Sequence, residues 1–376
     1  MKIAFIDVTT TVTYGGIQTA VWQLAIALTD AGHEVTVFGG EGTIRPDLRG
    51  RNVRIETFPF TPREKAWDLG SRFRRMVERW TFARHARHAV IAGDFDWAVI
   101  TKPFDFFWPW IIPSGSKTRF AFRSGGTDFY ASDKLQAKRI DAWFANSHFN
   151  AWQIKSRYRI YPRVIYNGVD LDRFTPQAAD PALRAGLGVA EHDMLMVFAG
   201  RIVGWKGLKV ALHALADSRL RSQPIKFLVI GDGPQRQELE TLARQLGIME
   251  QIIFHPAQPH AKLPPYYASA DVGLFPSVGD EGFSNSIAEA MASGLPVIAT
   301  AFSGNPETVG NEGSCGLLVT PGDPVELAGA IRQLADSAQL RRKMGQAARS
   351  RIATLYTWDK VAQRLLAGLN VAGHRQ

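Results

Sequence analysis

The chain has 376 residues, of which 45% are hydrophobic and 21% charged, a composition typical of a folded globular protein and not of a disordered one. A single hydrophobic core stops growing well below this length, so we expect two domains. Cys315 is the only cysteine, which excludes an internal disulfide and fits a reducing compartment. The net charge of +9 would suit nucleic acid, an anionic membrane or a phosphorylated substrate as the partner.

The first residues do not have the pattern of a targeting segment. Asp7 and the threonines after it interrupt the opening apolar run too early for a secretory signal peptide. No stretch of the sequence reaches the ~20 apolar residues that a membrane span needs. We therefore expect a cytoplasmic protein, either soluble or peripheral on the inner face of the plasma membrane.

The first half alternates short apolar strands with helical patterns. A strand over 2–7 precedes Gly15-Gly16, a helix-spaced apolar run over 17–28 and a second strand over 34–38. A strand, a glycine turn, a helix and a strand make a βαβ unit, which predicts a parallel sheet. Further strands of this sheet are expected at 97–100, 119–122 and 142–145.

The second half repeats this alternation. Its strands are expected at 195–199, 226–230, 251–254, 272–275 and 296–300. Helical stretches separate them at 207–218, 234–247, 261–269 and 284–293. A Pro- and Ala-rich stretch over 176–181 has the composition of a linker. We therefore divide the chain into a domain over 1–172 and a domain over 173–357.

Two glutamates flank the start of the helix that follows the fourth strand of the second half. Glu281 and Gly282 lie in the loop, and the helix begins near Ser284, where unpaired N–H groups and the positive helix end favour a diphosphate. A carboxylate repels phosphate, so Glu281 and Glu289 are better suited to accept hydrogen bonds from sugar hydroxyls. The alternative is that both are simply favourable charges near a helix start. Ser286 and Glu289 also have capping-box spacing.

Two cations follow another strand of the same expected sheet. Arg201 and Lys206 come just after the strand that ends near Ala199, and ligands of open α/β sheets bind outside the carboxyl ends of the strands. Arg201 could hold phosphate oxygens as a fork and Lys206 as a point charge. The alternative is a solvated pair of loop charges. Because two separate loops bring suitable groups to one sheet edge, the sequence favours a site for a diphosphate that carries a sugar.

Motifs for other chemistries are absent or poorly placed in the sequence. Asp94-Phe-Asp96 precedes a strand and Asp170-Leu-Asp172 lies near the domain boundary, so both are better explained as turn or cap residues than as metal ligands. No His/Cys cluster has metal-ligand spacing, and the glycine turn of the first half lacks the G-x-G-x-x-G spacing of dinucleotide sites. The sequence therefore predicts no metal and no bound cofactor.

Taken together, these segments resemble the large retaining glycosyltransferase family four, which has the GT-B fold. Glu281 and Glu289 form an E-x7-E element, and Gly282-Phe283 follow the first glutamate. The other segments that carry the resemblance are 165–174, 199–207, 230–234, 294–298 and 316–322. The resemblance covers almost the whole chain, is weaker between 45 and 140, and is to the bacterial cell-surface polysaccharide or lipopolysaccharide type.

The resemblance implies two Rossmann-like domains whose parallel sheets face each other across a cleft. The N-terminal domain would bind the acceptor, and a C-terminal helix over about 358–376 would cross back to it. In the second domain, Arg201 and Lys206 would neutralise the donor diphosphate and stabilise the leaving group, Glu281 would bind the donor sugar, and Glu289 would bind the ribose. The other donor-binding residues would be Gly15, Gly16, Gly282, Phe283, Ser284 and Asn285.

The implied activity is metal-independent transfer of a hexose-type sugar with retention of configuration. The donor would be a UDP-sugar or GDP-mannose, and the acceptor a glycan or a lipid-linked sugar in cell-envelope polysaccharide or lipopolysaccharide synthesis. The departing phosphate oxygen would take the acceptor proton, so catalysis would depend on positioning and on stabilising the leaving charge.

Three other functions remain as alternatives. The first is another enzyme on the same fold, such as a nucleotide-sugar epimerase or a phosphorylase. The second is a nucleic-acid-binding protein, which the local character of the positive charge and the absence of a nucleic-acid motif disfavour. The third is an inactive scaffold, which the presence of both glutamates and both cations disfavours.

One position departs from the pattern of the family. Many relatives carry a histidine after a strand near residue 120, where this chain has Arg123. Arg123 could bind donor phosphate or an anionic acceptor, and Asp128 could orient an acceptor hydroxyl. The alternative is that Arg123 forms a salt bridge at the strand end.

Much of the positive charge of the first half lies in 63–87. Over 71–88, arginines surround an apolar helical face made of Phe73, Met76, Val77 and Trp80, which is the profile of an interfacial membrane helix. An aromatic cluster over 104–112 could also meet lipid. We therefore expect contact with an anionic membrane through 63–87 and a membrane-bound acceptor, a polyprenyl-diphosphate sugar or a lipopolysaccharide core. The alternative is that the apolar face packs on the sheet and the arginines are solvated.

Overall fold

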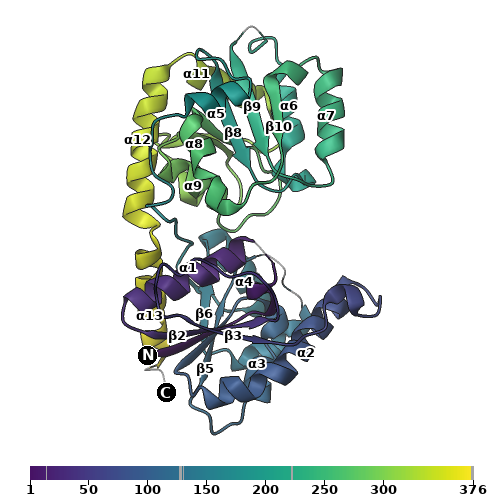
Figure 1. Cartoon of the computed structure of the whole chain (residues 1–376), viewed down its shortest axis with the longest axis vertical. Coiled ribbons are helices and arrows are strands. Elements are labelled where there is room, and N and C mark those ends of the chain that lie inside the picture. The colour runs from purple at the N-terminus through teal and green to yellow at the C-terminus, as the bar shows by residue number, and fades with distance from the viewer. Residues whose placement is uncertain (14, 127–128, 130, 222, 374–376) are drawn as a thin grey trace. The chain divides into compact units, whose positions relative to one another are not determined.

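The computed structural model describes the chain except for residues 14, 127–128, 130, 222 and 374–376. It forms two compact units (Figure 1), of which the first is Met1–Gly168 with Trp358–Gln376 and the second is Val169–Thr357. The first unit ends a few residues before residue 172, the boundary taken from the sequence. The reason is that the Val169 N–H donates to the Tyr356 carbonyl at 2.8 Å, which ties the following segment to the second unit.

The first unit contains a seven-stranded sheet in the order β3-β2-β1-β4-β5-β6-β7. The strands are β1 (Lys2–Ile6), β2 (Glu34–Gly40), β3 (Arg54–Phe58), β4 (Trp97–Ile100), β5 (Arg119–Arg123), β6 (Ala142–Ala145) and β7 (Arg163–Val164). Neighbouring strands are parallel. The five strands expected in this half are confirmed. Both strands at the sheet edges were missed, because β3 is half polar and β7 has only two residues.

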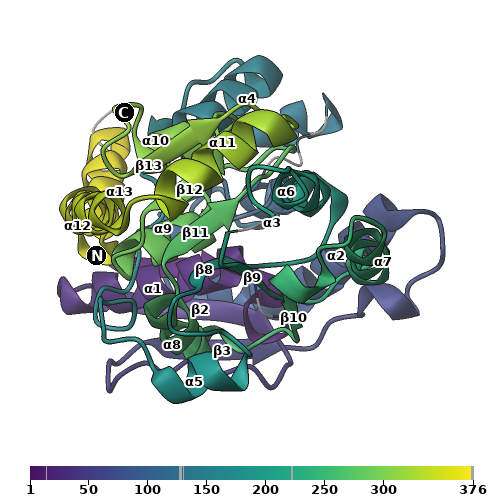
Figure 2. The same cartoon turned by 90° about the horizontal axis from the view of Figure 1, so that it is seen from above.

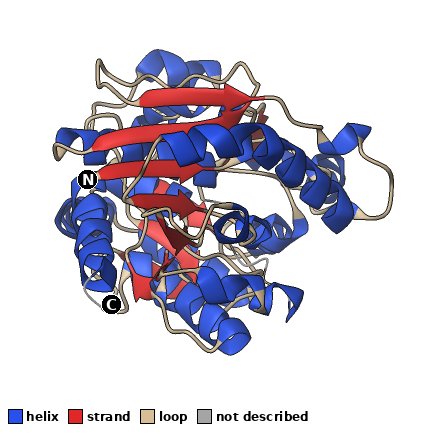
Figure 3. Cartoon of the chain, turned by 90° about the horizontal axis from the view of Figure 1, so that it is seen from below, coloured by secondary structure: helices blue, strands red, loops and turns tan. Residues whose placement is uncertain are grey.

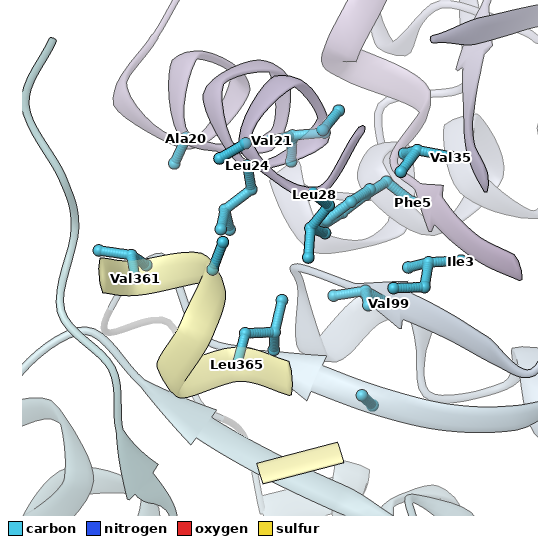
Figure 4. Close-up of a cluster of buried hydrophobic side chains, with 14 of the residues drawn as sticks. Ile3, Phe5, Ala20, Val21, Leu24, Leu28, Val35, Val99, Val361 and Leu365 are labelled. Atoms are coloured by element: carbon cyan, nitrogen blue, oxygen red, sulfur yellow. The ribbon is translucent and has the colours of Figure 1, made fainter. Parts of the chain in front are cut away.

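Helices cover both faces of this sheet. They are α1 (Gly16–Asp30), α2 (Ser71–Ala92), α3 (Trp108–Ile111), α4 (His148–Tyr158) and α13 (Trp358–Gly373), with short 3-10 helices at Val8–Thr11, Arg63–Lys65, Pro103–Asp105, Ala131–Lys134 and Gln136–Arg139. On one face, α1 and α13 share a buried cluster with the sheet, in which Val21 and Leu24 of α1 lie beside Val361 and Leu365 of α13 (Figure 4). On the other face, α2, α3 and α4 enclose a second cluster.

The second unit contains a six-stranded sheet in the order β10-β9-β8-β11-β12-β13. The strands are β8 (Met194–Ala199), β9 (Ile225–Ile230), β10 (Ile252–His255), β11 (Val272–Phe275), β12 (Val297–Thr300) and β13 (Gly316–Val319). They are again parallel. Five of these strands were expected within a residue or two, and β13 was not predicted as a strand.

The helices of the second unit lie on both sides of its sheet (Figure 2). Figure 3 shows the strands and helices of the first unit from below. The helices of the second unit are α5 (Pro181–Gly186), α6 (Leu208–Leu215), α7 (Arg236–Gln245), α8 (Pro264–Ser269), α9 (Asn285–Ala292), α10 (Asn305–Val309), α11 (Pro324–Ala335) and α12 (Ala338–Leu355), with 3-10 helices η6 (Gly204–Lys206), η7 (Met249–Gln251) and η8 (His260–Lys262). Two parallel sheets, each between layers of helices, confirm the predicted pair of Rossmann-like domains. Among the described residues, no helix is both long and apolar enough to cross a bilayer.

Helix α2 buries a different face from the apolar face that the sequence pattern indicated. Its buried face is formed by Phe82, Ala83, Ala86 and Val90 together with Arg79. In the apolar face read from the sequence, Met76 and Trp80 are 51% and 48% exposed. The alternative in which that face packs on the sheet is therefore wrong. The aromatic segment 104–112 is largely buried, and Trp110 is its one strongly exposed ring. Most of this segment therefore cannot meet lipid, contrary to the sequence prediction.

Arg79 lies inside a buried charge network at the carboxyl ends of β1 and β4. Its guanidinium contacts Asp7 at 3.3 Å and also pairs with Asp105. Burial opposes ionisation of Asp7, but Arg79 and hydrogen bonds from Thr101 and Thr9 outweigh it and hold the Asp7 pKa below its usual value. For Asp105, burial outweighs the attraction of Arg79 and raises the pKa to about 7. Arg79 is thus buried, and not solvated as the alternative interpretation of 71–88 assumed.

Candidate active site

The predicted donor residues of the second unit lie at the carboxyl edge of its sheet. Strands β9, β8, β11 and β12 are consecutive neighbours there, and their following loops lie side by side because the strands are parallel. Arg201 and Lys206 follow β8, and Glu281 follows β11. Glu289 lies in the second turn of α9, which begins at Asn285.

The loop after β9 fixes the backbone that carries Arg201. Ile202 donates to the Asp232 carbonyl at 2.9 Å and accepts from the Gln235 N–H at 3.3 Å. Gly231 has φ +156°, and a Cβ there would stand 1.9 Å from the Gly200 carbonyl oxygen. The glycines of the 230–234 segment therefore allow two neighbouring loops to touch backbone to backbone.

The loop after β11 is joined to η6 in the same manner. The Trp205 carbonyl accepts from the N–H groups of Val278 and Gly279, at 2.8 and 3.1 Å. Gly207 has φ +70°, and a Cβ there would lie 1.8 Å from the Pro276 carbonyl oxygen. These contacts set the position of Lys206 against the loop that carries Glu281.

We expect Gly207→Ala to loosen this junction. A non-glycine residue at this φ costs about 1–3 kcal/mol, and the contact with Pro276 must also open. The free energy of unfolding, measured by urea denaturation, should fall by at least that amount. Gly329→Ala in α11 is the control, because its Cβ would meet nothing within 4 Å and a helical Ala is favoured. Equal stability of the two variants would contradict the assignment.

Lys206 and Glu281, 75 positions apart, form the central pair of the site. The Lys206 ammonium lies 2.9 Å from Glu281 Oε1, and the two side chains are 14% and 10% exposed. The Ser277 hydroxyl donates to the same oxygen. The Glu281 N–H donates to Ser303 Oγ at 2.8 Å and its carbonyl accepts from the Gly304 N–H at 3.1 Å. The structure therefore brings together two residues that the sequence placed in separate loops.

Arg201 is exposed and carries no ion pair in the described part of the chain. Its guanidinium stands 5.8 Å from the centroid of the Trp205 ring, and the Lys206 ammonium stands 4.5 Å from the same centroid. Sequence reasoning missed Trp205, although an aromatic residue between two cations of one loop was a signal for this contact. The positive charge of Arg201 remains available to an anionic ligand.

Glu289 pairs with a residue that the sequence analysis did not select. Its Oε1 lies 2.8 Å from Nε2 of His260, which belongs to η8 after β10. The proposed capping box is wrong, because the N-cap of α9 is Ser284 and the Ser286 hydroxyl donates to the Ala199 carbonyl at 2.9 Å. No local sequence pattern links positions 260 and 289, so only the fold could reveal this pair.

The remaining predicted donor residues of this unit form the entry to α9. Phe283 and Ser284 are buried, and the Phe283 ring lies 5.4 Å from that of Tyr356. A Cβ at Gly304 would lie 1.5 Å from the Gly282 carbonyl oxygen, so the loop after β12 closely supports this entry. Contact of Gly282, Phe283, Ser284 and Asn285 with a ligand stays a prediction.

In the first unit, the predicted ligand residues divide into two groups. Gly15 is the N-cap of α1 and Gly16 its first residue, and both are exposed beyond the carboxyl end of β1. Arg123 is 1% exposed and donates to Asn167 and to the Tyr166 carbonyl at 3.3 Å. Burial lowers its pKa to about 10. This packing favours a structural role over contact with an anionic ligand.

Two further sequence predictions concern acidic residues. Asp128 lies outside the described residues. Asp170 accepts from the N–H groups of Asp172 and Arg173, both at 3.2 Å, which is the turn role expected for this Asp-x-Asp segment. Across the described ranges, no group of three or more His, Cys, Asp or Glu side chains is placed to hold a metal ion.

Comparison with known families divides the chain within about a dozen residues of the structural boundary after Gly168. Residues 14–173 match the family described as Glycosyltransferase Family 4, and residues 180–351 match Glycosyl transferases group 1. Each of the two structural units therefore carries a match to one glycosyltransferase family. Arg201, Lys206, Glu281 and Glu289 fall in the group 1 domain, and Gly15 and Gly16 fall in the family 4 domain.

Individual relatives match part of the chain. Over 208 residues, the chain is 37% identical to a D-inositol 3-phosphate glycosyltransferase from Streptomyces avermitilis, covering 53% of this chain and 44% of that protein. The chain spans about half the length of the curated relatives it matches.

Two solved structures share the fold at low sequence identity. A sucrose-phosphate synthase from Thermosynechococcus elongatus superimposes with a TM-score of 0.82 at 21% identity, covering 100% of each chain. The HepE protein of Anabaena, in complex with UDP-glucose, superimposes with a TM-score of 0.76 at 20% identity, covering 99% of this chain and all of that one.

Proposed function

We propose that this chain is a retaining, metal-independent glycosyltransferase that moves a hexose-type sugar from a nucleotide-diphosphate sugar to a glycan or lipid-linked acceptor. The observation that carries the proposal is the Lys206–Glu281 pair beside the unpaired Arg201, at the sheet edge where α9 begins. Cations there suit a leaving diphosphate, and a held carboxylate suits sugar hydroxyls. The proposed setting is cell-envelope polysaccharide or lipopolysaccharide synthesis on the cytoplasmic side.

In the proposed chemistry, these side chains have different roles. The acceptor hydroxyl oxygen bonds to the anomeric carbon on the face that the leaving group occupies. The bond from that carbon to the phosphate oxygen breaks, and this oxygen takes the acceptor proton. Arg201 and Lys206 stabilise the charge that develops on the diphosphate. Glu281 holds the sugar through Oε2, which accepts no hydrogen bond from the described residues, because Oε1 is occupied by Lys206 and Ser277.

Both a UDP-sugar and GDP-mannose remain candidate donors. HepE was solved with UDP-glucose, and one relative is an MMP alpha-(1->4)-mannosyltransferase. Thermal unfolding with UDP-glucose or GDP-mannose, each in the presence of EDTA, tests donor binding and metal independence together. We expect one donor to raise the Tm. If neither donor raises the Tm at millimolar concentration, the proposal is contradicted. In a separate incubation without any acceptor, conversion of the donor sugar would favour an epimerase.

The acceptor side of the proposal rests on a surface of the first unit. We call this surface the aromatic-basic surface. Its apolar side chains are Trp67, Leu69, Met76, Trp80 and Trp110, which are 80%, 67%, 51%, 48% and 43% exposed, and its cations are Lys65 and Arg84. Trp80 packs edge-on against Phe107, which places α2 beside the α3 segment. Figure 1 shows α2 and the loop before it standing out from the body of the unit. Exposed tryptophans and leucines of this kind suit a lipid–water interface.

Positive charge accompanies this surface. Four arginines of 63–87 are paired: Arg63 with Glu78, Arg72 with Asp133, Arg74 with Asp68, and the buried Arg79 with Asp7 and Asp105. In the described part of the chain, Lys65 and Arg84 have no ion pair. Each unneutralised cation contributes about 1 kcal/mol near an anionic leaflet. We therefore propose that the aromatic-basic surface rests on an anionic membrane that presents a lipid-linked acceptor.

Flotation with phosphatidylglycerol-rich vesicles tests this surface. We expect the wild-type protein to float with the vesicles at low salt, and a Trp67→Ser, Leu69→Ser double variant to remain largely in the unbound fraction. Trp152→Ser is the matched control, because Trp152 is 58% exposed elsewhere on the same unit. The membrane proposal fails if the wild type does not float at low salt, or if the control loses binding equally.

A further inference from the structure

A chain of polar contacts links the start of the second unit to Glu289. Nε2 of His260 lies 2.8 Å from Glu289 Oε1, and Nδ1 of His260 lies 3.5 Å from an Arg173 guanidinium nitrogen. Arg173 in turn lies 3.8 Å from an Asp170 carboxylate oxygen. Phe174 holds the imidazole from one side, with ring centroids 5.2 Å apart. The E-x7-E glutamate is therefore tied to the segment just after the domain boundary.

The direction of these contacts fixes the state of the imidazole. A guanidinium can only donate, so Nδ1 of the neutral ring accepts from Arg173 and Nε2 carries the proton that is donated to Glu289. One carboxylate oxygen of Glu289 is thereby occupied. The other oxygen, Oε2, accepts no hydrogen bond from the described residues. It is also not one of the side-chain atoms that are sealed from solvent without a partner.

Protonation of His260 would rearrange this chain. The charged and titratable groups that act on His260 are Glu289 of α9 and, from the segment after the boundary, Arg173 and Asp170. Burial lowers the His260 pKa, but Glu289 outweighs it, so the pKa lies above the usual 6.5. A proton on Nδ1 removes the acceptor for Arg173 and places two cations face to face. The same proton draws the Glu289 carboxylate into an ion pair and makes it a weaker acceptor for any other donor.

We propose that His260 is a positioning residue for nucleotide recognition: it occupies Oε1 of Glu289 and orients Oε2 toward the ribose hydroxyls of the donor. This inference rests on the proposed function, in which Glu289 binds the ribose. It adds a residue that the E-x7-E element does not contain, and it makes ribose recognition sensitive to the protonation state of that residue.

Calorimetric titration of UDP and GDP, each against its 2′,3′-dideoxy counterpart, tests the inference. The ratio of the two Kd values measures recognition of the ribose hydroxyls alone, since the diphosphate contributes equally to both. We expect His260→Ala to reduce this ratio on the order of tenfold, the effect of one lost charge-assisted contact. His192→Ala is the control, because this side chain is 76% exposed and precedes the amino end of β8, whereas the site lies beyond the carboxyl end of that strand.

His260→Gln separates positioning from folding. A glutamine amide can donate to Oε1 but cannot be protonated, so we expect this variant to keep most of the discrimination. In the wild type, the discrimination should weaken as the pH falls through the His260 pKa, and in His260→Gln it should not change over that range. Unchanged discrimination in His260→Ala, or identical pH profiles in wild type and His260→Gln, would overturn the inference alone. If the wild type binds neither UDP nor GDP, the proposed function is overturned as well.

Discussion

Replacing Arg201 with alanine should lower kcat/KM for the donor on the order of 100-fold, with little change in the Tm. The magnitude is that of a single lost donor to a developing negative charge. The unchanged Tm follows from the environment of Arg201, which is exposed and has no ion pair among the described residues; its guanidinium stands 5.8 Å from the Trp205 ring centroid. Initial rates of transfer over a range of donor concentrations, with a thermal melt of each variant, measure both quantities.

A matched pair of variants makes this prediction specific. Arg221→Ala removes another exposed arginine of the same unit, and its rate should stay close to that of the wild type. Arg201→Lys keeps the charge but not the two-pronged hydrogen bonding, so its rate should fall between those of wild type and Arg201→Ala. A fully active Arg201→Ala would remove this residue from the proposed mechanism.

Replacing Arg79 with leucine should destabilise the protein by about 3–5 kcal/mol, because it leaves buried carboxylates without their cation. Asp7 and Asp105 are 1% and 2% exposed, so neither can reach water without opening the fold. Urea denaturation measures the loss. Arg84→Leu, on the exposed side of the same helix, should change stability by no more than about 0.5 kcal/mol. Similar stabilities of the two variants would show that the Arg79 network contributes little.

The same network predicts how stability depends on pH. The Asp105 pKa is raised from 3.8 to about 7, so between roughly pH 4 and 7 the native state binds more protons than the unfolded state. Through Asp105, stability therefore falls as the pH rises across this window. The lowered pKa of Asp7 has the opposite effect, since it makes the protein more stable as the pH rises. This contribution to stability is complete above the usual pKa of 3.8 and is lost only as the pH falls below it. Asp105→Asn should flatten the slope between roughly pH 4 and 7, and an unaltered slope would contradict the assignment.

The sequence predicted most of the fold because buried parallel strands form apolar runs that can be read locally. Strand β4 (Trp97–Ile100) and strand β11 (Val272–Phe275) were located to the residue. Strand β3 was missed because Arg54-Ile-Glu-Thr-Phe58 alternates polar and apolar residues at a sheet edge. Lys206 and Glu281 were both selected because each follows an apolar strand, and the parallel order then places their loops together.

The rest of the site depends on contacts that no local pattern encodes. Arg79 belongs to a run of arginines that looks uniformly solvated, and its buried state follows from Asp7 and Asp105, which lie far from it in sequence. The partner of Glu289 comes from η8, a segment without a distinctive motif. Arg123 stands at a strand end where exposure was expected, yet Asn167 and the Tyr166 carbonyl hold it inside. In each case, the environment of the side chain is determined by residues that the tertiary fold brings next to it.

The packing of α13 against α1 has a consequence for how the protein is made. Val361, Leu365 and Leu369 complete the buried cluster that Val21 and Leu24 begin, although more than three hundred residues separate them in the chain. A ribosome releases the first domain long before it synthesises this helix, so the part of α1 that contacts α13 stays uncovered during translation of the whole second domain. The early chain is then the species most in need of a chaperone. Fusing 358–373 behind residue 168 should yield a first domain that folds without the second.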